Sequence, residues 1–400
     1  GEACSVSKER PRRGALAAPS PVPWMAQCLQ GIAAYAQQRG GWTFVTSPPT
    51  LGGAEELALT AYALRHWPGD GVIAAIHDPH EARAARRLRI PVVNLSGVLR
   101  HCGLPRVMVD QQAVGRLAAE HLLERGLRRL AFYGLRGPWY SQQRLRGFLQ
   151  RAAQDQVPCE VLEAPPSSDA RASWTRRTAS LAQWLRTLQP PVGVLAVHDY
   201  RARVLVDECL NLGLRVPHDV AVLGVDNDTT VCEFCPPTLS SISRGPWQVG
   251  YEAAAMLERL MAGRRAPAAD LLLAPEGVVA RRSTETVVVE NAHVREAIQF
   301  MHDHLGESFT VEQLVQQAAV SRRLLEKRFR QHLDCTPREY LCRLRIERAK
   351  QILAGASKPR VPDLARACGF ADAKRFRLAF HRLVGLSPMR YRRSILRSPG

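Results

Sequence analysis

The stretch from Thr310 to Tyr391 constrains the fold more than any other part of the chain, because one helical pattern occurs in it twice. Each copy consists of a short helix, a tight turn and a second helix rich in arginine and lysine. The first copy reads TVEQLVQQAAVSRRLLEKRFRQHL from Thr310, and the second reads VPDLARACGFADAKRFRLAFHRLVGLSPMRYRR from Val361. We therefore predict two helix-turn-helix units in tandem.

Capping residues and apolar spacing set the limits of the helices predicted in this stretch. Thr310 and Gln313 form a capping box at the start of the first short helix, while Ser321 and Asp372 cap the two basic helices. Apolar side chains at helical spacing are expected to face inward. These residues are Leu324, Leu325 and Phe329 on the first basic helix and Phe376, Ala379 and Phe380 on the second. The predicted helices of this region are 293–304, 311–319, 322–333, 338–353, 363–368 and 373–383.

Positive charge is concentrated in the same part of the chain. Residues 291–400 contain 22 Lys or Arg against 10 Asp or Glu, a balance of +12, whereas the preceding 290 residues carry the remaining +6. A genomic bias toward arginine explains arginine in place of lysine, but not a local excess of cations over anions. One basic helix is usually only a solvated surface. Two basic helices joined by a rigid helix fit successive major grooves about 34 Å apart, so we predict that this region binds double-stranded DNA.

Short apolar runs alternate with helical runs before residue 285. Such alternation is typical of βαβ units and a parallel sheet, and it occurs in two successive rounds of similar size, so we predict an α/β region with two lobes and a cleft between them. Gly126 is expected to end one helix. The predicted strands are 15–19, 42–46, 71–76, 91–95, 107–109, 130–133, 192–197 and 220–225. The predicted helices are 25–38, 54–66, 80–88, 115–125, 141–154, 174–188 and 201–212.

Polar and aromatic side chains follow several of these strands, where ligands of open α/β sheets bind. Aromatic rings cover the apolar faces of a sugar, while carboxylates, amides and arginine bind its hydroxyl groups, so the set suits a small polar metabolite. The alternative for each residue is structural; Asp199, for example, would also serve as a helix N-cap. The candidates are Trp24, Trp139, Tyr140, Arg144, His198, Asp199, Asp226, Asn227 and Asp228.

Five short motifs of this α/β region resemble the effector domain of LacI-type repressors and periplasmic sugar-binding proteins. They are VDQQAVGRLAAEHLLERGLRRLAFYG (109–134), RLRGF (144–148), VLAVHD (194–199), VLGVDND (222–228) and VVARRST (278–284). The resemblance implies a periplasmic-binding-protein-like sensor with parallel sheets, in which Arg144, the pair His198–Asp199 and Asp226 match family motif positions, the arginine being a ligand contact. The chain departs from the family at His198, where Asn is common, and in the apolar loop from Pro19 to Trp24, where residues that bind sugar are frequent.

The closing segment from Gly369 to Arg393 resembles the AraC/XylS family, with its Gly-Phe, Phe-x-x-x-Phe, Gly-x-Ser-Pro and Tyr-Arg landmarks. The resemblance implies that each basic helix reads base edges. The matching positions are Arg322, Arg323, Glu326 and Lys327 in the first unit and Ala373, Lys374, Arg377 and Leu378 in the second. Because the family often has a long polar residue where Leu378 stands, the second helix is expected to read fewer bases. Arg328, Arg330 and Arg375 are expected to contact phosphates.

These predictions combine into a tail at 1–13, a two-lobed α/β sensor at 14–284, a linker at 285–292 and an all-α tandem helix-turn-helix domain at 293–396. A LacI-like sensor ahead of an AraC-type domain resembles the xylose-operon regulators of bacteria. That order implies an activator that responds to D-xylose or a related pentose. We expect a homodimer that binds a DNA operator, with RNA polymerase as a further partner.

Neither a cofactor nor a metal is expected. The 10 cysteines show no paired framework, and the CxxC motif at Cys232 and Cys235 lacks the second pair of ligands that a zinc site needs. We expect no leader peptide, and the sequence has no apolar run long enough to cross a bilayer. We therefore expect reduced thiols in a cytoplasmic protein associated with the bacterial nucleoid, and no membrane partner.

Two other classes of function would use the same α/β fold. An enzyme acting on a sugar or nucleotide would use the same cleft, but the sequence has no phosphate-binding loop, no clear dinucleotide fingerprint after a strand and no nucleophile elbow. A transport-type binding protein would share the sensor fold, but it would not need the basic C-terminal domain.

Overall fold

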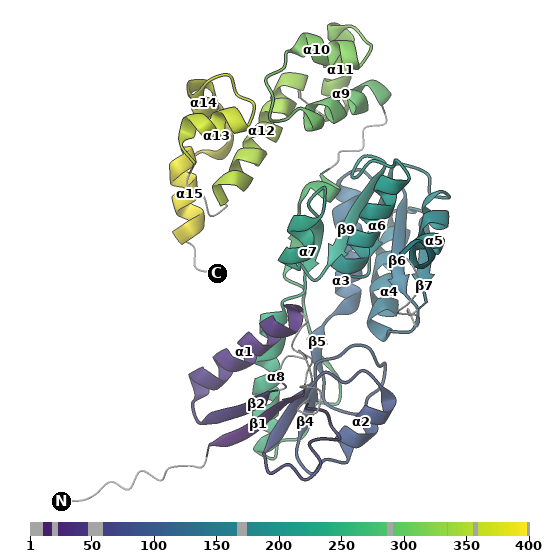
Figure 1. The fold of residues 1–400 in the computed structure, drawn as a ribbon, viewed down its shortest axis with the longest axis vertical. Coiled ribbons are helices and arrows are strands. Elements are labelled where there is room, and N and C mark those ends of the chain that lie inside the picture. The colour runs from purple at the N-terminus through teal and green to yellow at the C-terminus, as the bar shows by residue number, and fades with distance from the viewer. Residues whose placement is uncertain are drawn as a thin grey trace, which may run out of the picture. The chain divides into compact units, whose positions relative to one another are not determined.

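The computed structural model describes residues 11–17, 23–46, 59–165, 174–285, 291–333, 335–354 and 359–397. The chain folds into two compact units, Gly1–Val287 and Val288–Gly400 (Figure 1). Most of the predicted linker at 285–292 lies outside the described residues, since 286–290 are not among them.

The first lobe of the larger unit is built on a parallel four-stranded sheet with the strand order β2-β1-β3-β4. Ile73 of the central strand β3 and Met25 of α1 are fully buried in a core that also includes Met256 of α8. The strands are β1 (Arg12–Ala17), β2 (Trp42–Thr46), β3 (Gly71–Ala74) and β4 (Val92–Asn94), and the helices are α1 (Pro23–Arg39), α2 (Pro79–Arg86) and α8 (Pro246–Met261).

The second lobe contains a six-stranded sheet with the order β12-β10-β9-β8-β6-β7, parallel except for β12. Alternate residues of each strand face opposite sides. Val192 and Val194 pack in the cluster that includes α5 and α6, whereas Phe132 contacts Phe148 of α4 with ring centroids 6.2 Å apart. The strands are β6 (Leu130–Leu135), β7 (Cys159–Ala164), β8 (Val192–Ala196), β9 (Val220–Val225), β10 (Ser240–Ser243) and β12 (Gly277–Val279). The helices are α3 (Gln111–Glu124), α4 (Trp139–Gln154), α5 (Trp174–Leu185), α6 (Asp199–Asn211), α7 (Thr229–Phe234) and the short 3-10 helix η2 (Arg282–Thr284).

The two lobes are not two successive halves of the chain, as the alternation of elements had predicted. After β10 the chain returns to the first lobe, where α8 packs on α1, and it returns again to form β12. The crossing strands β5 (Val107–Val109) and β11 (Leu271–Leu273) pair in parallel. Helices α1 and α8 approach so closely that a Cβ at Gly31 would lie 1.9 Å from the Trp247 carbonyl oxygen. This contact requires glycine.

Several predicted limits differ from the structure for local reasons. Strand β1 begins at Arg12, inside the predicted tail, because residues 12–16 pair with β2. Of the helix predicted at 54–66, residues 54–58 lie outside the described part, and 61–66 form a turn that ends at His66, whose φ is 65°. Strands β7, β10, β11 and β12 and helices α7, α8 and α15 were not predicted. Gly126 does end α3, with a φ of 81°.

The smaller unit is all-helical, with two cores that share one long helix, α12. Leu344 of α12 packs in the first core with Leu325 and Phe329, and Ile346 packs in the second core with Phe376. The helices are α9 (Ala292–Asp303), α10 (Val311–Gln317), α11 (Arg322–Leu333), α12 (Pro337–Ala354), α13 (Val361–Ala367), α14 (Ala373–Val384) and α15 (Pro388–Arg397). Two helix-turn-helix units joined by a helix were predicted, and this is the fold observed.

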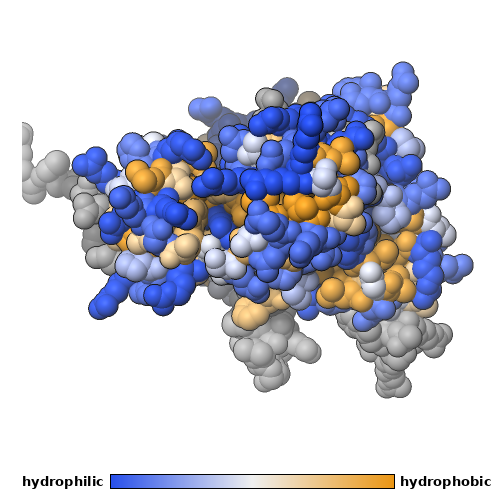
Figure 2. Space-filling model, turned by 90° about the horizontal axis from the view of Figure 1, so that it is seen from above, coloured by the Kyte–Doolittle hydropathy of each residue, from blue (hydrophilic) through white to orange (hydrophobic). Residues whose placement is uncertain are grey.

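Hydrophilic side chains cover much of the molecular face drawn in Figure 2, with smaller hydrophobic patches between them. Within the described ranges, no helix has the length and apolar character needed to cross a membrane.

Candidate functional sites: a polar cleft and two basic helices

A cleft of about 490 Å³ lies between the two lobes of the larger unit. The first lobe supplies a largely apolar wall that includes Cys28, Leu95 and Val249, whereas the second lobe supplies charged and polar side chains from the ends of its strands. Of the predicted ligand-binding residues, the cleft brings together Trp24, Tyr140, Arg144, His198, Asp199, Asp226 and Asp228. The carboxyl ends of parallel strands meet at one edge of a sheet, which explains how residues so far apart in sequence meet.

Arg144 lines the cleft and is fixed in position by burial and by two hydrogen bonds. Its side chain is 2 % exposed, its Nε donates to the Gln111 Oε1 at 2.7 Å, and its Nη1 donates to the carbonyl oxygen of Val197. Its guanidinium lies 5.0 Å from the centroid of the Tyr140 ring. Burial lowers the pKa of Arg144 to about 10, so the group stays charged at neutral pH. These two bonds leave Nη2 as a fixed cationic donor.

His198 is the N-cap of α6, and this role fixes its tautomer. Its Nδ1 accepts a hydrogen bond from the backbone N–H of Arg201 at 3.3 Å, so the proton of the neutral ring lies on Nε2. Burial lowers the pKa of His198 to about 4, so the ring is neutral at physiological pH. The imidazole can therefore donate one hydrogen bond from Nε2 without bringing a charge into the cleft.

Asp199 and Asp228 are engaged largely by the protein itself. The carboxylate of Asp199 accepts from the Ser241 hydroxyl at 2.5 Å and from the backbone N–H of Asp228 at 2.8 Å. Burial raises the pKa of Asp199 to about 7. Asp228 caps α7 by accepting from the backbone N–H groups of Thr230 and Val231. The N-cap of α6 is His198, not Asp199, and Asp199 instead ties β10 and α7 to α6.

Asp226 and Arg244 form an ion pair in the wall of the cleft. The Arg244 Nε lies 2.6 Å from the Asp226 Oδ1, although the two atoms are not aligned as a hydrogen bond. The guanidinium of Arg244 also lies 5.0 Å from the Trp24 ring centroid. Asp226 has a φ of 117°, a conformation that costs a non-glycine residue energy and is typical of ligand-binding positions. Both residues follow strands of the second lobe, and Arg244 reaches the first lobe through its contact with Trp24, so the charges lie where a ligand can engage both lobes.

Two predicted ligand residues, Trp139 and Asn227, lie outside the cleft, and Arg244, which pairs with Asp226, was not predicted. Trp139 lines a separate hollow, and the Asn227 side chain accepts from Arg281 at 3.0 Å. Arg244 follows β10, so the rule that found the other candidates would have found it. That strand reads SSIS and lacks the apolar run by which strands were recognised. Gln27, His77, Ser96 and Gln111 also line the cleft and were not predicted.

Helix α11 of the smaller unit carries the first set of predicted DNA-contacting residues. Leu325 and Phe329 are fully buried, whereas Leu324, predicted to face inward, is 36 % exposed. Leu324 immediately precedes the buried Leu325, so its side chain points about 100° away from the buried side of the helix. The expected outward residues are exposed or half-buried: Arg322, Arg323, Glu326, Lys327, Arg328 and Arg330. Arg322 forms two ion pairs: its Nε lies 3.1 Å from the Glu326 Oε1, and its Nη1 lies 3.2 Å from the Glu312 Oε1.

Helix α14 carries the second set. Asp372 caps it by accepting from the backbone N–H of Arg375 at 2.7 Å, and Phe376 and Phe380 are fully buried. Leu378 is 64 % exposed. Lys374, Arg375 and Arg377 are exposed as well, and Ala373 is half-buried. Both basic helices thus present a polar face beside a buried apolar line, the arrangement of a helix that enters a major groove.

The predicted caps of the first unit are present. Thr310 and Gln313 form the capping box, and the Ser321 hydroxyl accepts from the backbone N–H of Leu324 at 3.3 Å. Ala319 takes a φ of 52° in the turn between α10 and α11. These local contacts hold α11 at a fixed angle on α10.

Both units of the chain match families of known proteins. Residues 119–284 match the family model of a periplasmic binding protein-like domain, and residues 314–394 match that of a helix-turn-helix domain. Together with the fold, these matches define the class: a DNA-binding transcription regulator with a periplasmic-binding-protein-like domain ahead of an AraC-type helix-turn-helix domain.

Within this class the chain is similar to the xylose operon regulatory proteins. It is 28% identical to the protein of Escherichia coli over 92% of this chain and 93% of that protein. It is 26% identical to the protein of Haemophilus influenzae over 81% of this chain and 84% of that protein. The solved structure of a xylose-binding transcription activator, xylR, superposes with a TM-score of 0.76 at 26% identity, covering 96% of this chain and 98% of that one.

Proposed function

We propose that the inter-lobe cleft binds a small sugar, D-xylose or a related pentose, and that binding controls how the two basic helices engage an operator. The observation that carries the proposal is the convergence of Arg144, His198 and Asp226 beside the rings of Trp24 and Tyr140. Fixed donors and acceptors next to aromatic faces suit a ligand with hydroxyl groups on a compact ring. The similarity to xylose operon regulatory proteins supports the choice of a pentose.

The proposed mechanism couples the cleft to DNA through closure of the lobes. A sugar that contacts residues of both lobes binds the closed form better than the open form, and it shifts the population by that difference in affinity. We propose that the chain acts as a homodimer, in which closure changes the spacing of two pairs of helices on DNA. The proposed outcome is activation, with RNA polymerase as the partner recruited.

Thermal unfolding of the full-length chain with pentoses, hexoses and polyols tests the ligand class. A ligand that binds only the folded state stabilises it by about 2.7 kcal/mol at a hundred times its Kd. We expect a pentose to raise the unfolding temperature of the wild type and of a matched control, Asp155→Asn, whose carboxylate lies on the surface of the second lobe. Asp226→Ala should lose the response. A panel without any stabilising sugar would refute the ligand class.

An enzyme acting on a sugar in the same cleft is the competing function. We propose that the cleft binds without catalysing, in keeping with relatives that are transcription regulators. Incubation of the protein with the sugar that stabilises it, followed by product analysis, tests this point. Turnover that Asp226→Ala abolishes would replace the regulator function with an enzymatic one.

A further inference from the structure

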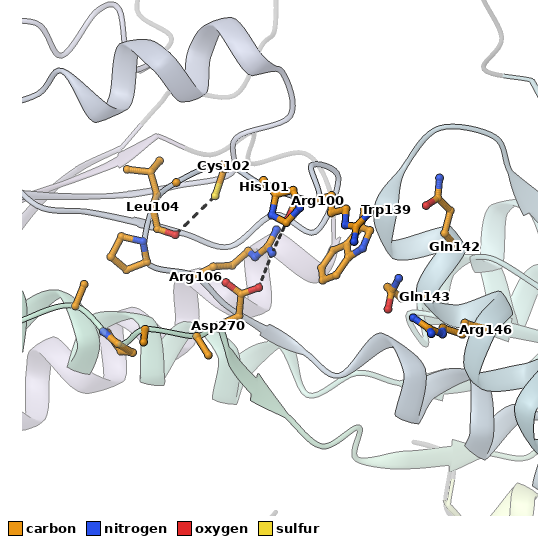
Figure 3. Close-up of a pocket in the computed structure, with 16 residues that line it drawn as sticks. Arg100, His101, Cys102, Leu104, Arg106, Trp139, Gln142, Gln143, Arg146 and Asp270 are labelled. Atoms are coloured by element: carbon orange, nitrogen blue, oxygen red, sulfur yellow. Dashed lines mark hydrogen bonds and ion pairs between the residues drawn. The ribbon is translucent and has the colours of Figure 1, made fainter.

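A second hollow, of about 1010 Å³, lies in the larger unit and shares no lining residue with the cleft (Figure 3). We call it the basic hollow. It is lined by the loop 100–106 before β5, by the first turns of α4 and by residues 266–270 before β11. Three arginines, Arg100, Arg106 and Arg146, line it, against the single carboxylate of Asp270.

Arg106 is the buried anchor of the basic hollow. Its side chain is 4 % exposed, its Nη1 donates to the Leu99 carbonyl oxygen at 2.6 Å, and its Nη2 lies 2.5 Å from the Asp270 carboxylate. The charge of Asp270 is therefore already matched. The buried Nε of Arg106 has no hydrogen-bond partner among the described residues, and such a group costs free energy until a ligand or water satisfies it.

Arg100 and Arg146 supply charge that no described side chain neutralises. Both are exposed, and neither guanidinium has an ion pair or hydrogen bond among the residues that the structure describes. In Figure 3 Arg100 lies on the same side as Arg106 and Asp270, and Arg146 lies opposite with Gln142 and Gln143. Both arginines line the same hollow, and a guanidinium group without an anion can bind phosphate through charge-assisted hydrogen bonds.

The neutral side chains between these arginines suit the rest of a sugar. The Trp139 ring lies between the two sides of the hollow, 4.7 Å from the guanidinium of Arg106. Gln142 is exposed, and Gln143 uses its Oε1 to accept from Gln112 at 2.8 Å, which leaves its own N–H donors. An aromatic ring with amides beside it can contact a sugar ring and its hydroxyl groups, as in other polar ligand sites.

We propose that the basic hollow is a second ligand site, for a phosphorylated monosaccharide. Arg100 and Arg146 bind the phosphate, and Trp139, Gln142 and Gln143 contact the sugar. This assignment gives Trp139 a ligand, although the residue lies outside the cleft. It does not depend on what the cleft binds.

The position of the basic hollow connects it to closure of the lobes. Its loop 100–106 belongs to the first lobe and α4 to the second, and the backbone N–H of Trp139 donates across to the Val98 carbonyl oxygen at 2.9 Å. A phosphate bound by Arg100 of the first lobe and Arg146 of the second lobe would attract the two lobes to each other, and this attraction would depend on the distance between them. By reciprocity, the phosphorylated sugar and the cleft ligand change each other's affinity by the same factor.

Calorimetric titration of the full-length chain at low salt tests the site. The probes are ribose 5-phosphate, glucose 6-phosphate, inorganic phosphate and the two parent sugars. We expect at least one sugar phosphate to bind saturably and more tightly than inorganic phosphate. Arg100→Gln combined with Arg146→Gln should weaken it by about tenfold or more, because two charge-assisted bonds are lost. The matched double variant Arg89→Gln with Arg186→Gln removes the same charge from exposed positions outside the hollow and should bind like the wild type.

Two further variants separate this site from the cleft and from a bare anion site. Asp226→Ala should retain sugar phosphate binding, and Trp139→Leu should weaken the sugar phosphates while leaving inorganic phosphate unchanged. The proposal is overturned if no sugar phosphate binds, if the Arg100 and Arg146 double variant binds as the wild type does, or if inorganic phosphate binds as tightly as the sugar phosphates. Binding of a polyglutamate peptide, but of no sugar phosphate, with the same dependence on Arg100 and Arg146 would instead assign the surface to an acidic protein.

Discussion

The two helix-turn-helix units have the same apolar frame but different outer surfaces. Phe329 on α11 and Phe376 on α14 are both fully buried, and α12 contributes side chains to both cores. On the outer face of α11, Arg322 is paired with Glu312 and Glu326. On α14, the Arg375 Nε lies 3.4 Å from the Asp372 Oδ2, and Leu378 is 64 % exposed. Arg323 and Lys327 of α11, like Lys374 and Arg377 of α14, have no ion pair among the described residues.

This difference shows which part of the sequence is constrained by folding. A buried line at helical spacing is needed for each helix to pack, so it occurs in both units. The outer face contributes little to stability and is free to differ. Before it binds DNA, Arg322 must leave two exposed ion pairs, each of which contributes about 0–1 kcal/mol. Each helix thus has cations with and without an ion pair, and the outer faces differ mainly at Leu378, where the second helix lacks a long polar side chain.

Replacement of the buried phenylalanines should have the largest effect. Phe329→Ala and Phe376→Ala each leave a cavity, and each should lower the free energy of unfolding of the smaller unit by about 3–5 kcal/mol. Because Leu344 and Ile346 of α12 pack in the two cores, we expect one shared unfolding transition, measured by chemical denaturation. Leu383→Ala, at a position 40 % exposed, is the control and should cost less than about 1 kcal/mol, on the order expected of surface changes. Two separate transitions would show that the units are independent.

Removal of one arginine from each basic helix should have the next largest effect. Arg323→Ala and Arg377→Ala should each weaken specific operator binding by about 1–3 kcal/mol if the arginine contacts a base. Competition with nonspecific DNA gives the measurement, since a base contact changes specificity and a phosphate contact does not. An equal loss on specific and nonspecific DNA would assign that arginine to phosphate.

A longer polar side chain at position 378 should have a smaller effect on affinity and a visible effect on specificity. Leu378→Gln gives α14 an amide that can donate to or accept from a base edge. Selection from a randomised operator should show a new preference at one base pair within the half-site of the second unit. Leu386→Gln, at a position 37 % exposed beyond the C-cap of α14, is the matched change. An unchanged preference would place Leu378 away from the bases.

Removal of the ion pair between Arg322 and Glu326 should have the smallest effect on operator affinity. Glu326→Gln removes one exposed ion pair, so operator affinity should change by about 1 kcal/mol or less. The sign is informative: tighter binding shows that the ion pair restrains Arg322, and weaker binding shows that Glu326 itself contacts a base. A salt titration separates the two cases from a general change of charge.

The helix limits and the buried apolar residues of both units could be predicted from the sequence, because they depend on capping residues and apolar spacing within each helix. The limits of α11 and its Ser321 cap follow from spacing and capping alone, as do strands β2 and β9. The outer positions of α14 were also predicted, apart from the half-buried Ala373.

The lining of the cleft was harder to predict, because the position of a residue after a strand does not show in which direction its side chain points. Trp139 and Tyr140 are neighbours on α4, about 100° apart around the helix axis, and only Tyr140 lines the cleft. Arg244 was missed because β10 has few apolar residues. The return of α8 to the first lobe depends on its contact with α1, which no local pattern in either helix reveals.

We propose that a ligand in the cleft controls both basic helices, and one titration tests this control most directly. Operator binding by the full-length chain is measured with and without D-xylose, for the wild type and for Asp226→Ala. We expect the sugar to change the operator affinity of the wild type and to leave that of Asp226→Ala unchanged, while the steep salt dependence expected of phosphate contacts remains. Operator affinity that no pentose changes, or binding with a salt slope near zero, would contradict it.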